Sequence, residues 1–450
     1  MRRIPALLIT ATLLLGAPAH ASDVPQAVVL FENVRVFDGK GDVLSAPTNV
    51  LVRGNRIERI STAPIPVDRR ADTRIIAGGG RTLMPGLIDA HWHAMMASVP
   101  MLVLMTGDVG YLNLLASREA EATLMRGFTS VRDLSGPAFG LKRAIDEGIV
   151  AGPRIWPSGA MISQSGGHGD FRMPHEVPAA RNAPLSRGEA TGGGMIADGP
   201  DEVRKRAREQ LMLGASQLKL AAGGGVSSMY DPIDVSQYTE EEFRAAVEAA
   251  ENWGTYVTVH AYTPRAIQTA VRAGVKVIDH GQLMDEATAK LMADKGVWLS
   301  IQPFLDNEFS NPQVGEARAK QLEVSAGTDR AYALAKKFGI KTAFGTDILF
   351  SPKMPATQGA QLATLTRWYT PPEILRMATS TNAQLLALSG PRNPYPGALG
   401  VVEEGALADL LLVDGDPTAD IRLVADPGRN FLVIMKDGRI YKNAIAPEGL

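Results

Sequence analysis

The sequence predicts an α/β fold in which a (β/α)8 TIM barrel carries a small β-sandwich domain formed from both chain ends. Between residues 81 and 395, eight short apolar segments of strand character alternate with stretches whose apolar residues recur every three to four positions. This alternation is typical of βα units around a parallel sheet. Residues 22–80 and 396–450 show short strand patterns and turn signals instead. The glycine-rich signatures of nucleotide-binding folds are missing, so an open doubly wound sheet is the less favoured alternative.

Residues 1–21 have the pattern of a secretory signal peptide. Arg2 and Arg3 precede the apolar segment Ile4–Leu15, and Ala19-His20-Ala21 fits the small-x-small cleavage pattern. The apolar segment is shorter than the roughly 20 residues that span a bilayer, so an uncleaved anchor is only the alternative. Cleavage after Ala21 would make the protein periplasmic or secreted.

The predicted barrel strands and helices follow one another between residues 81 and 395. The strand segments are Leu87–His93, Thr129–Asp133, Arg154–Ser158, Gln217–Ala222, Tyr256–Ala261, Val275–His280, Trp298–Gln302 and Thr342–Asp347. The clearest helical patterns are Asp201–Leu213, Glu240–Asn252, Pro264–Ala273, Glu286–Ala293 and Asp329–Phe338.

Both flanks consist of short strand patterns, and neither is long enough to bury much of a core alone. The N-terminal ones are Val28–Asn33, Asn49–Arg53, Ile57–Ile60 and Thr73–Ile76, and the C-terminal ones are Asp409–Val413, Phe431–Lys436 and Arg439–Tyr441. We therefore expect residues 22–80 and 396–450 to form one β domain beside the barrel.

The composition excludes several classes of function. Lys and Arg total 46 and Asp and Glu total 48, so the net charge of −2 gives no sign of a nucleic-acid or membrane partner. The chain has no cysteine, so it has no disulfide, no thiolate metal site and no cysteine nucleophile.

Polar residues with metal-binding chemistry end several predicted strands. His91 and His93 flank Trp92, and the two-residue period of a strand points both imidazoles to the same side. His260, His280 and Asp347 end three later strands. Each histidine alone fits a structural role, and Asp347 alone fits a helix cap. Because the carboxyl ends of barrel strands converge, the set together indicates a divalent metal site.

Lys219 lies inside the otherwise apolar strand segment 217–222. Burying an ammonium group is costly unless it is paired or altered. One alternative is a lysine paired with a carboxylate or neutralised by burial. The other is a lysine carbamate, an anion whose two oxygens could bridge two cations.

The motifs around these residues resemble the amidohydrolase superfamily, in its binuclear branch with a carboxylated lysine. They are PGLIDAHWH (85–93), QLKLAAGGGVSS (217–228), VTVHAY (257–262), VIDHG (277–281), FGTD (344–347), NAQLLAL (382–388) and GALADLLLVDGDP (405–417). The resemblance covers roughly residues 26–445. Within the superfamily the chain is similar to imidazolonepropionase-like and prolidase-like bacterial amidohydrolases, including ochratoxin-degrading ones.

The resemblance implies a role for each matching residue. His91, His93 and Asp347 would bind the buried metal, His260 and His280 the exposed one, and N6-carboxylated Lys219 would bridge them. Two Zn²⁺ ions are the expected cofactors, although another divalent metal is possible. A hydroxide bridging them would attack an amide carbonyl, and Asp347 would move the proton from the hydroxide to the leaving amine.

Two residues are candidates for substrate contact. His168 lies in a glycine-rich segment after the third strand, and we expect it to hydrogen-bond the substrate carbonyl oxygen. A loop-stabilising histidine is the alternative. Tyr230 follows the fourth strand, near the position where related dipeptidases bind the α-carboxylate, although a packing role is also open. Segments 163–200, 223–238 and 304–322 are expected to shape the pocket.

The expected activity is therefore hydrolysis of an amide bond to a C-terminal amino acid, as in a dipeptide, an N-acyl amino acid or an ochratoxin-A-like amide. The first alternative is a lactonase or a cyclic-amide or imide hydrolase with the same metals. A mononuclear deaminase is disfavoured by Lys219, and a silent binding barrel by the complete set of ligand positions. Relatives suggest a homo-oligomer, by analogy only.

Overall fold

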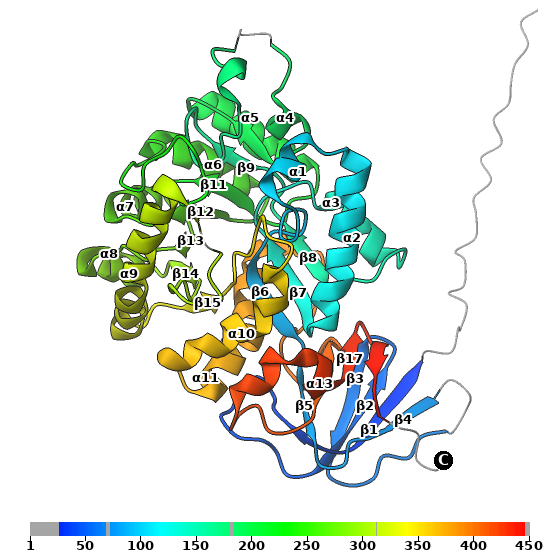
Figure 1. Cartoon of the computed structure of the whole chain (residues 1–450). Helices are drawn as coiled ribbons and strands as arrows, with labels where there is room; N and C mark the ends of the chain where they lie inside the picture. Colours follow the sequence, from blue (N-terminus) through cyan, green and yellow to red (C-terminus); the bar gives the residue numbers. More distant parts are fainter. Residues whose placement is uncertain (1–26, 69–72, 180–182, 312, 446–450) are drawn as a thin grey trace, which may run out of the picture.

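The computed structural model describes residues 27–68, 73–179, 183–311 and 313–445. The expected signal peptide, residues 1–21, lies outside the described residues. The described chain forms a barrel of strands surrounded by helices, and a β-sheet lies beside the barrel, below it in the view of Figure 1.

The barrel strands are all parallel and follow the predicted order. They are β6 (Leu87–Trp92), β7 (Phe128–Asp133), β8 (Arg154–Pro157), β9 (Met161–Ser163), β11 (Leu218–Ala221), β12 (Val257–Ala261), β13 (Val277–His280), β14 (Trp298–Ile301) and β15 (Thr342–Phe344), with β10 (Gly194–Ile196) at the edge of β9. The third predicted strand segment continues into β9, and Gly159 at φ 72° separates β8 from β9.

Hydrogen bonds join the two barrel sheets at both seams. The first sheet runs β6–β7–β8, and the second runs from β10 and β9 to β15. At one seam the Ser216 N–H donates to the Pro157 carbonyl at 2.8 Å, and at the other the Asp347 N–H donates to the His91 carbonyl at 2.8 Å. The second bond places the last strand beside the first, as a closed barrel requires.

Helices cover the outside of the barrel. The longer ones are α2 (Val109–Met125), α3 (Phe139–Asp146), α5 (Pro200–Met212), α6 (Glu240–Asn252), α7 (Pro264–Ala273), α8 (Glu286–Asp294) and α9 (Gly315–Phe338). Shorter ones are α1 (Met101–Thr106), α4 (Arg187–Ala190), α10 (Gln358–Ala363), α11 (Pro371–Arg376), α12 (Asn382–Leu386) and α13 (Pro427–Asn430). The short 3₁₀ segments are η1 (Pro174–Glu176), η2 (Met354–Thr357), η3 (Thr364–Arg367), η5 (Ala387–Arg392, kinked at Gly390) and η6 (Ile421–Ala425), and η4 (Met377–Thr381) is a π-helical segment.

Four of the five predicted helices agree with the structure to within one residue at each end. The fifth prediction, Asp329–Phe338, captured only the C-terminal part of α9. Among the described residues, no helix combines the length and the apolar character that crossing a bilayer requires.

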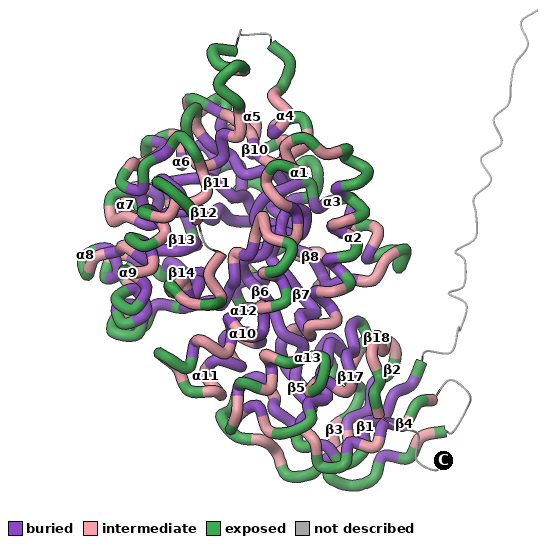
Figure 2. The backbone as a smooth tube through the Cα atoms, viewed as in Figure 1, coloured by how far each residue is buried: buried purple, intermediate pink, exposed green. Residues whose placement is uncertain are grey.

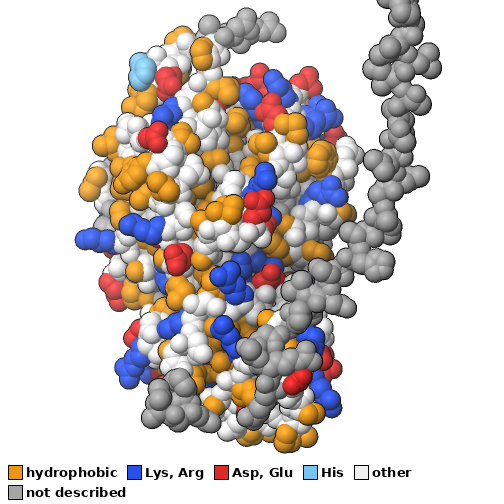
Figure 3. All heavy atoms as spheres, turned by 90° about the vertical axis from the view of Figure 1, so that its right-hand side faces the viewer, with side chains coloured by type: hydrophobic (Ala, Val, Ile, Leu, Met, Phe, Trp, Pro, Cys, Tyr) orange, Lys and Arg blue, Asp and Glu red, His pale blue; other side chains and the backbone are white. Residues whose placement is uncertain are grey.

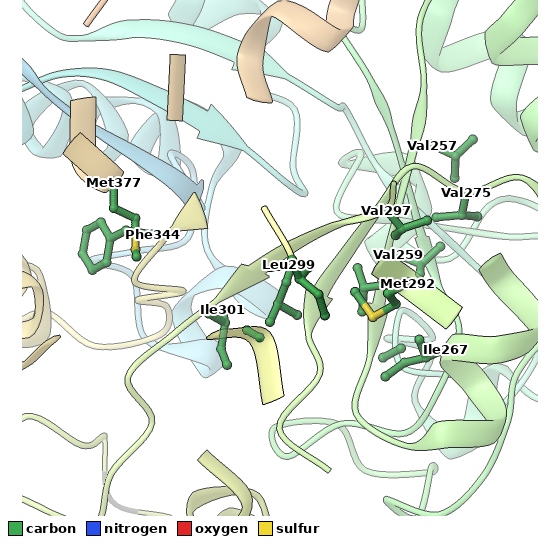
Figure 4. Close-up of a cluster of buried hydrophobic side chains, with 14 of the residues drawn as sticks. Val257, Val259, Ile267, Val275, Met292, Val297, Leu299, Ile301, Phe344 and Met377 are labelled. Carbon is green, nitrogen blue, oxygen red and sulfur yellow. The ribbon is translucent and has the colours of Figure 1, made fainter. Parts of the chain in front are cut away.

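The strands alternate between an apolar outer side and a polar inner side. On β12, Val257 and Val259 belong to the main hydrophobic cluster under the helices, together with Ile267 of α7 and Met292 of α8 (Figure 4). Thr258 and His260, between and after these valines, are buried and polar. This two-residue period sends polar side chains into the barrel, and the barrel centre is the most continuously buried part of the chain (Figure 2).

The sheet beside the barrel is built from both chain ends. Its strands are β1 (Val28–Val36), β2 (Thr48–Arg53), β3 (Arg56–Ser61), β4 (Thr73–Ala77), β5 (Thr82–Pro85), β16 (Leu410–Val413), β17 (Phe431–Lys436) and β18 (Arg439–Asn443). They pair in the order β18-β17-β16-β5-β1-β2-β3, and β4 also pairs with β1. All eight strands therefore belong to one hydrogen-bonded sheet. The two-layered sandwich and the exact domain boundaries stay predictions.

A buried ion pair ties this sheet to the barrel. Arg154 of β8 donates to Asp409 at 2.8 Å and to Asp437 at 2.7 Å, and the Arg154 and Asp409 side chains are only 6% and 2% exposed. On the outer surface, positive and negative side chains are interspersed over the face in Figure 3, consistent with the small net charge.

Candidate metal centre and active-site pocket

Asp347 meets both histidines of the HxH pair at the mouth of the barrel. Its Oδ1 lies 3.2 Å from His91 Nε2 and 2.8 Å from His93 Nε2. Ligand atoms of His91, His280 and Asp347 all lie within 4.8 Å of one another. Two imidazoles and a carboxylate at this separation fit a divalent cation.

His91, His260 and His280 are held neutral, as metal ligands must be. Burial lowers the pKa of His91 to about 4 and the pKa values of His260 and His280 well below the ordinary value. Burial opposes the charge of Asp347, but its interactions with His91 and His93 outweigh burial and hold its pKa well below the ordinary value. The carboxylate is therefore ionised beside neutral imidazoles.

His260 and His280 bring two further nitrogens from neighbouring strands, with ring centroids 4.4 Å apart. The Nδ1 of His280 donates to Gln302 Oε1 at 2.7 Å, while Gln302 Nε2 donates to His91 Nδ1 at 3.2 Å. Because Nδ1 carries the proton of this hydrogen bond, the Nε2 of His280 has a free lone pair that is available to a cation. Gln302 thus links the two proposed metal positions.

Lys219 is buried in the barrel and lines the same pocket as the histidines. Its Nζ is 2.5 Å from Asp279 Oδ2. Asp279 also accepts from Arg132 Nη2 at 2.7 Å and from Thr258 Oγ1 at 2.8 Å. Burial lowers the pKa of Lys219, and Asp279 opposes this change. The pairing of Lys219 with Asp279 corresponds to one of the two alternatives that the sequence left open. Carboxylation of Lys219 stays a prediction.

The backbone leaves the regular strand geometry where the ligands sit. His280 has φ 82° and Asp347 has φ 54°, a region that non-glycine residues rarely adopt. At position 345, a Cβ would lie 2.4 Å from the Cβ of His91, so glycine lets β15 approach β6. These features bring Asp347 against the HxH pair.

His168 joins the cluster from the segment after β9. Its ring stacks on His260 with centroids 3.8 Å apart and planes 20° from parallel. Its Nδ1 lies 2.8 Å from Ser228 Oγ, and a Cβ at position 225 would lie 2.0 Å from this Nδ1. Gly225 is therefore required for the close approach.

Tyr230 does not join the cluster. Its hydroxyl donates to the Arg172 carbonyl at 2.6 Å, the residue is 39% exposed, and it does not line the pocket. His175, for which the sequence predicted no role, lies in the exposed turn η1.

A pocket opens above the histidines, and its walls are largely apolar. All three segments predicted to shape it contribute, through residues such as Phe171, Val226 and Phe304. The sequence analysis missed a fourth wall, formed by residues 346–354, which adds Ile348, Leu349, Phe350 and Met354. The pocket therefore offers a hydrophobic space directly beside the cluster of histidines.

A sequence model of the amidohydrolase family matches residues 82–441, which include every barrel strand and His91, His93, Lys219, His260, His280 and Asp347. The chain belongs to the amidohydrolase family. It is therefore a hydrolase that acts on C–N bonds, in a family that is generally metal-dependent.

Known relatives of this amidohydrolase include fungal and peptide-cleaving enzymes. Ochratoxinase from Aspergillus niger is 32% identical over 390 residues, covering 82% of this chain and 77% of the relative. The crystal structure of that enzyme matches with a TM-score of 0.80 at 28% identity, covering 93% of this chain and 96% of the other.

Two solved peptidase structures are also similar. A prolidase complexed with N-methylphosphonate-L-proline matches with a TM-score of 0.83 at 34% identity, covering 92% of this chain and all of the other. A Xaa-Pro dipeptidase with bound methionine in the active site has a TM-score of 0.78 at 29% identity, with coverage of 92% and 100%.

Sequence reasoning missed several residues of this amidohydrolase site. Arg132, Asp279 and Gln302 support the ligands from the barrel interior, while Ser228 and Tyr262 line the pocket. Asp279 and Gln302 had a detectable signal, because each is a polar residue at the end of an apolar strand segment.

Proposed function

We propose that this amidohydrolase cleaves the amide bond to a C-terminal amino acid, using two divalent cations, with zinc as the first choice. The convergence of neutral imidazoles and an ionised Asp347 at the base of an apolar pocket carries the proposal. The named relatives favour this substrate class, since one is an ochratoxinase and another a prolidase. Dipeptides, N-acyl amino acids and ochratoxin-A-like amides are the candidate substrates.

The ligand set divides between two positions. His91, His93 and Asp347 would hold one cation, and His260 and His280 the other. Lys219, once carboxylated, would bridge them, and its Nζ sits in the barrel interior below the histidines. Bound there, the cations would supply a water activated at neutral pH and would polarise the scissile carbonyl.

The chain's own side chains handle the proton and the carbonyl oxygen. Asp347 is ionised and lies at the centre of the cluster, so it can accept a proton from the attacking water and return it to the leaving amine. His168, stacked on His260, would donate a hydrogen bond to the carbonyl oxygen. The apolar walls would exclude bulk water and hold the side chains of the substrate.

A lactone or a cyclic amide or imide remains the second candidate, since the same cations and Asp347 would serve its hydrolysis. We also propose that the protein is exported to the periplasm or the medium and that it assembles into a homo-oligomer. The pattern of residues 1–21 supports export. The exposed apolar residues Leu102 and Leu114 of α1 and α2 are compatible with contact between copies.

The test is product analysis by mass spectrometry with the zinc-loaded protein lacking residues 1–21. The panel holds dipeptides, including Xaa-Pro, N-acyl amino acids, ochratoxin A, a lactone and a cyclic imide. Release of a free amino acid from an amide, lost in Asp347→Asn and after chelation, supports the proposal. Turnover of only the lactone or imide would replace the substrate class, and inactivity with all substrates would reject it.

A further inference from the structure

One serine of the pocket wall bonds the imidazole of His168 at its edge. The Oγ of Ser228 lies 2.8 Å from His168 Nδ1, and both residues line the pocket. The Oδ2 of Asp231 is 3.6 Å from the same nitrogen, which is beyond hydrogen-bond distance. This Oδ2 already accepts from the Gly225 N–H at 2.8 Å. Ser228 is therefore the side chain that bonds this edge of the ring.

The backbone around Ser228 is held in place by buried groups. Asp231 is only 1% exposed, and its bond to the Gly225 N–H closes the segment between the two residues. From α9, the Nζ of Lys320 donates to the Asp231 carbonyl at 3.0 Å and to the Ser228 carbonyl at 3.4 Å. The Ser228 hydroxyl thus reaches His168 from a fixed backbone.

The stacking of His168 on His260 does not decide which way the imidazole of His168 is turned. The two ring planes lie 20° from parallel. Turning the His168 ring by 180° about its Cβ–Cγ bond keeps this flat contact but exchanges the places of ring nitrogens and ring carbons. Only one of the two orientations places a nitrogen against the Ser228 hydroxyl. The bond to Ser228 therefore selects the orientation.

We propose that Ser228 is a positioning residue for His168: its hydroxyl donates to Nδ1 and so keeps the imidazole proton on Nε2. A neutral imidazole has one donor and one acceptor nitrogen, so a hydroxyl that donates to Nδ1 selects the Nε2–H form. This inference rests on the proposed function, in which His168 donates a hydrogen bond to the carbonyl oxygen. A donor that is oriented in advance needs no reorganisation when charge develops on that oxygen.

The first test compares Ser228→Ala with the wild type on the best substrate of the panel. Losing the hydrogen bond that orients the donor should lower kcat by roughly 3- to 10-fold and change KM little. The metal content should not change, because Ser228 is not in the ligand set. Ser228→Thr keeps a hydroxyl at this position and should retain most of kcat.

The second test is a double-mutant cycle with His168→Ala, which separates a role through His168 from a structural one. Alanine is used because it removes the imidazole without adding a new hydrogen-bonding group. If Ser228 acts only through His168, the double variant should be no slower than His168→Ala alone.

Ser236→Ala is the matched control. Ser236 lies in the same segment after β11 and does not line the pocket, and its buried Oγ has no hydrogen-bond partner among the residues that the structure describes. This control should leave kcat, KM and the metal content unchanged.

Three results would overturn the assignment. The first is an unchanged kcat in Ser228→Ala. The second is a loss in the His168→Ala background as large as in the wild type, because the hydroxyl would then act without His168. The third is loss of bound metal in Ser228→Ala. If the proposed function itself fails, the wild type will cleave no substrate of the panel, and the role of Ser228 fails with it; an active wild type with an additive cycle rejects the role of Ser228 alone.

Discussion

Asp89 and Thr346 are joined by two hydrogen bonds, since the buried carboxylate accepts from the Thr346 N–H at 3.1 Å and from its hydroxyl at 2.6 Å. The same carboxylate accepts from the His91 N–H at 3.0 Å. One side chain therefore fixes the backbone beside two proposed metal ligands, His91 and Asp347. Outer partners of this kind orient ligands.

Thr346→Val should test this support. Removing the hydroxyl should lower metal affinity or activity by roughly 10- to 100-fold without unfolding the protein. Metal titration followed by activity measures the effect. Thr342→Val is the control, because the Thr342 hydroxyl bonds the Ile340 carbonyl and its side chain also interacts with Tyr369, neither of them a proposed ligand, so the change should be neutral for metal binding. Equal effects in both variants would contradict a specific role for Thr346.

Lys219→Ala should reduce the metal content from two ions per chain to one or fewer, because the bridging group is lost. Asp279 keeps its bonds to Arg132 and Thr258, so the variant should still fold. Elemental analysis after dialysis gives the metal content and circular dichroism the fold. Lys290→Ala, which removes an exposed lysine paired with Asp294, is the control. Two tightly bound ions in Lys219→Ala would reject the bridging role.

His168→Asn should lower kcat by roughly 100-fold while the metal content stays unchanged. The imidazole contacts His260 by stacking but is not in the ligand set, so its loss should spare the cations. Steady-state kinetics and elemental analysis on the same preparation separate the two effects. Loss of metal together with activity would place His168 among the ligands instead.

Arg154→Met should destabilise the protein by about 3–5 kcal/mol, because it leaves the buried Asp409 without its cation. Urea unfolding measures the change. The exposed pair of Arg143 with Glu147 provides the control, and Arg143→Ala should leave the free energy of unfolding nearly unchanged. Similar losses in both variants would argue against burial as the cause.

Asp133 should make the metal-free protein less stable as the pH rises. Burial raises the pKa of Asp133 to about 7, although the Ala94 N–H and His93 oppose this shift. A carboxyl group whose pKa is raised by folding stabilises the protein fully below its unfolded pKa of about 4, and this stability is lost as the pH rises through 7. His91, whose pKa is lowered to about 4, has the opposite effect between about pH 4 and 6.5.

The buried histidines contribute equally to the wild type and to Asp133→Asn, so the difference between the two proteins isolates Asp133. Between pH 6.5 and 8 the wild type should lose about 1 kcal/mol of unfolding free energy through this group. Asp133→Asn should lose less over the same range. Parallel profiles for the two proteins would show that Asp133 ionises normally.

The sequence predicted the strands well because they depend on local patterns, and the same patterns marked the polar residues that end them. Leu87–His93 and Val275–His280 are apolar segments that end in histidine, and both are strands with their histidines at the barrel mouth. The helix Val109–Met125 was missed, and its apolar residues show only weak periodicity. Gly159 divides the third strand in a way that composition does not reveal.

The supporting residues could not be predicted because their contacts are tertiary. Strand alternation would send Asp279 to the side opposite His280, yet the positive φ of His280 turns the chain at the end of β13. Asp279 then meets Lys219 and Arg132 from other strands. Tyr230 and Tyr262 both follow strands, and only the packing of the surrounding loops distinguishes the exposed tyrosine from the one in the pocket.

Because the chain is synthesised from its N-terminus, the sheet built from both chain ends can be completed only late in synthesis. The Thr82 hydroxyl bonds the Gly415 carbonyl, a partner 333 residues later, and β5 pairs with β16 along the same edge. Until β16 leaves the ribosome, β5 has an unpaired edge that can pair with another chain. The nascent protein therefore depends on its last strands to close its first ones, and a chain that stops before β16 will expose this edge permanently.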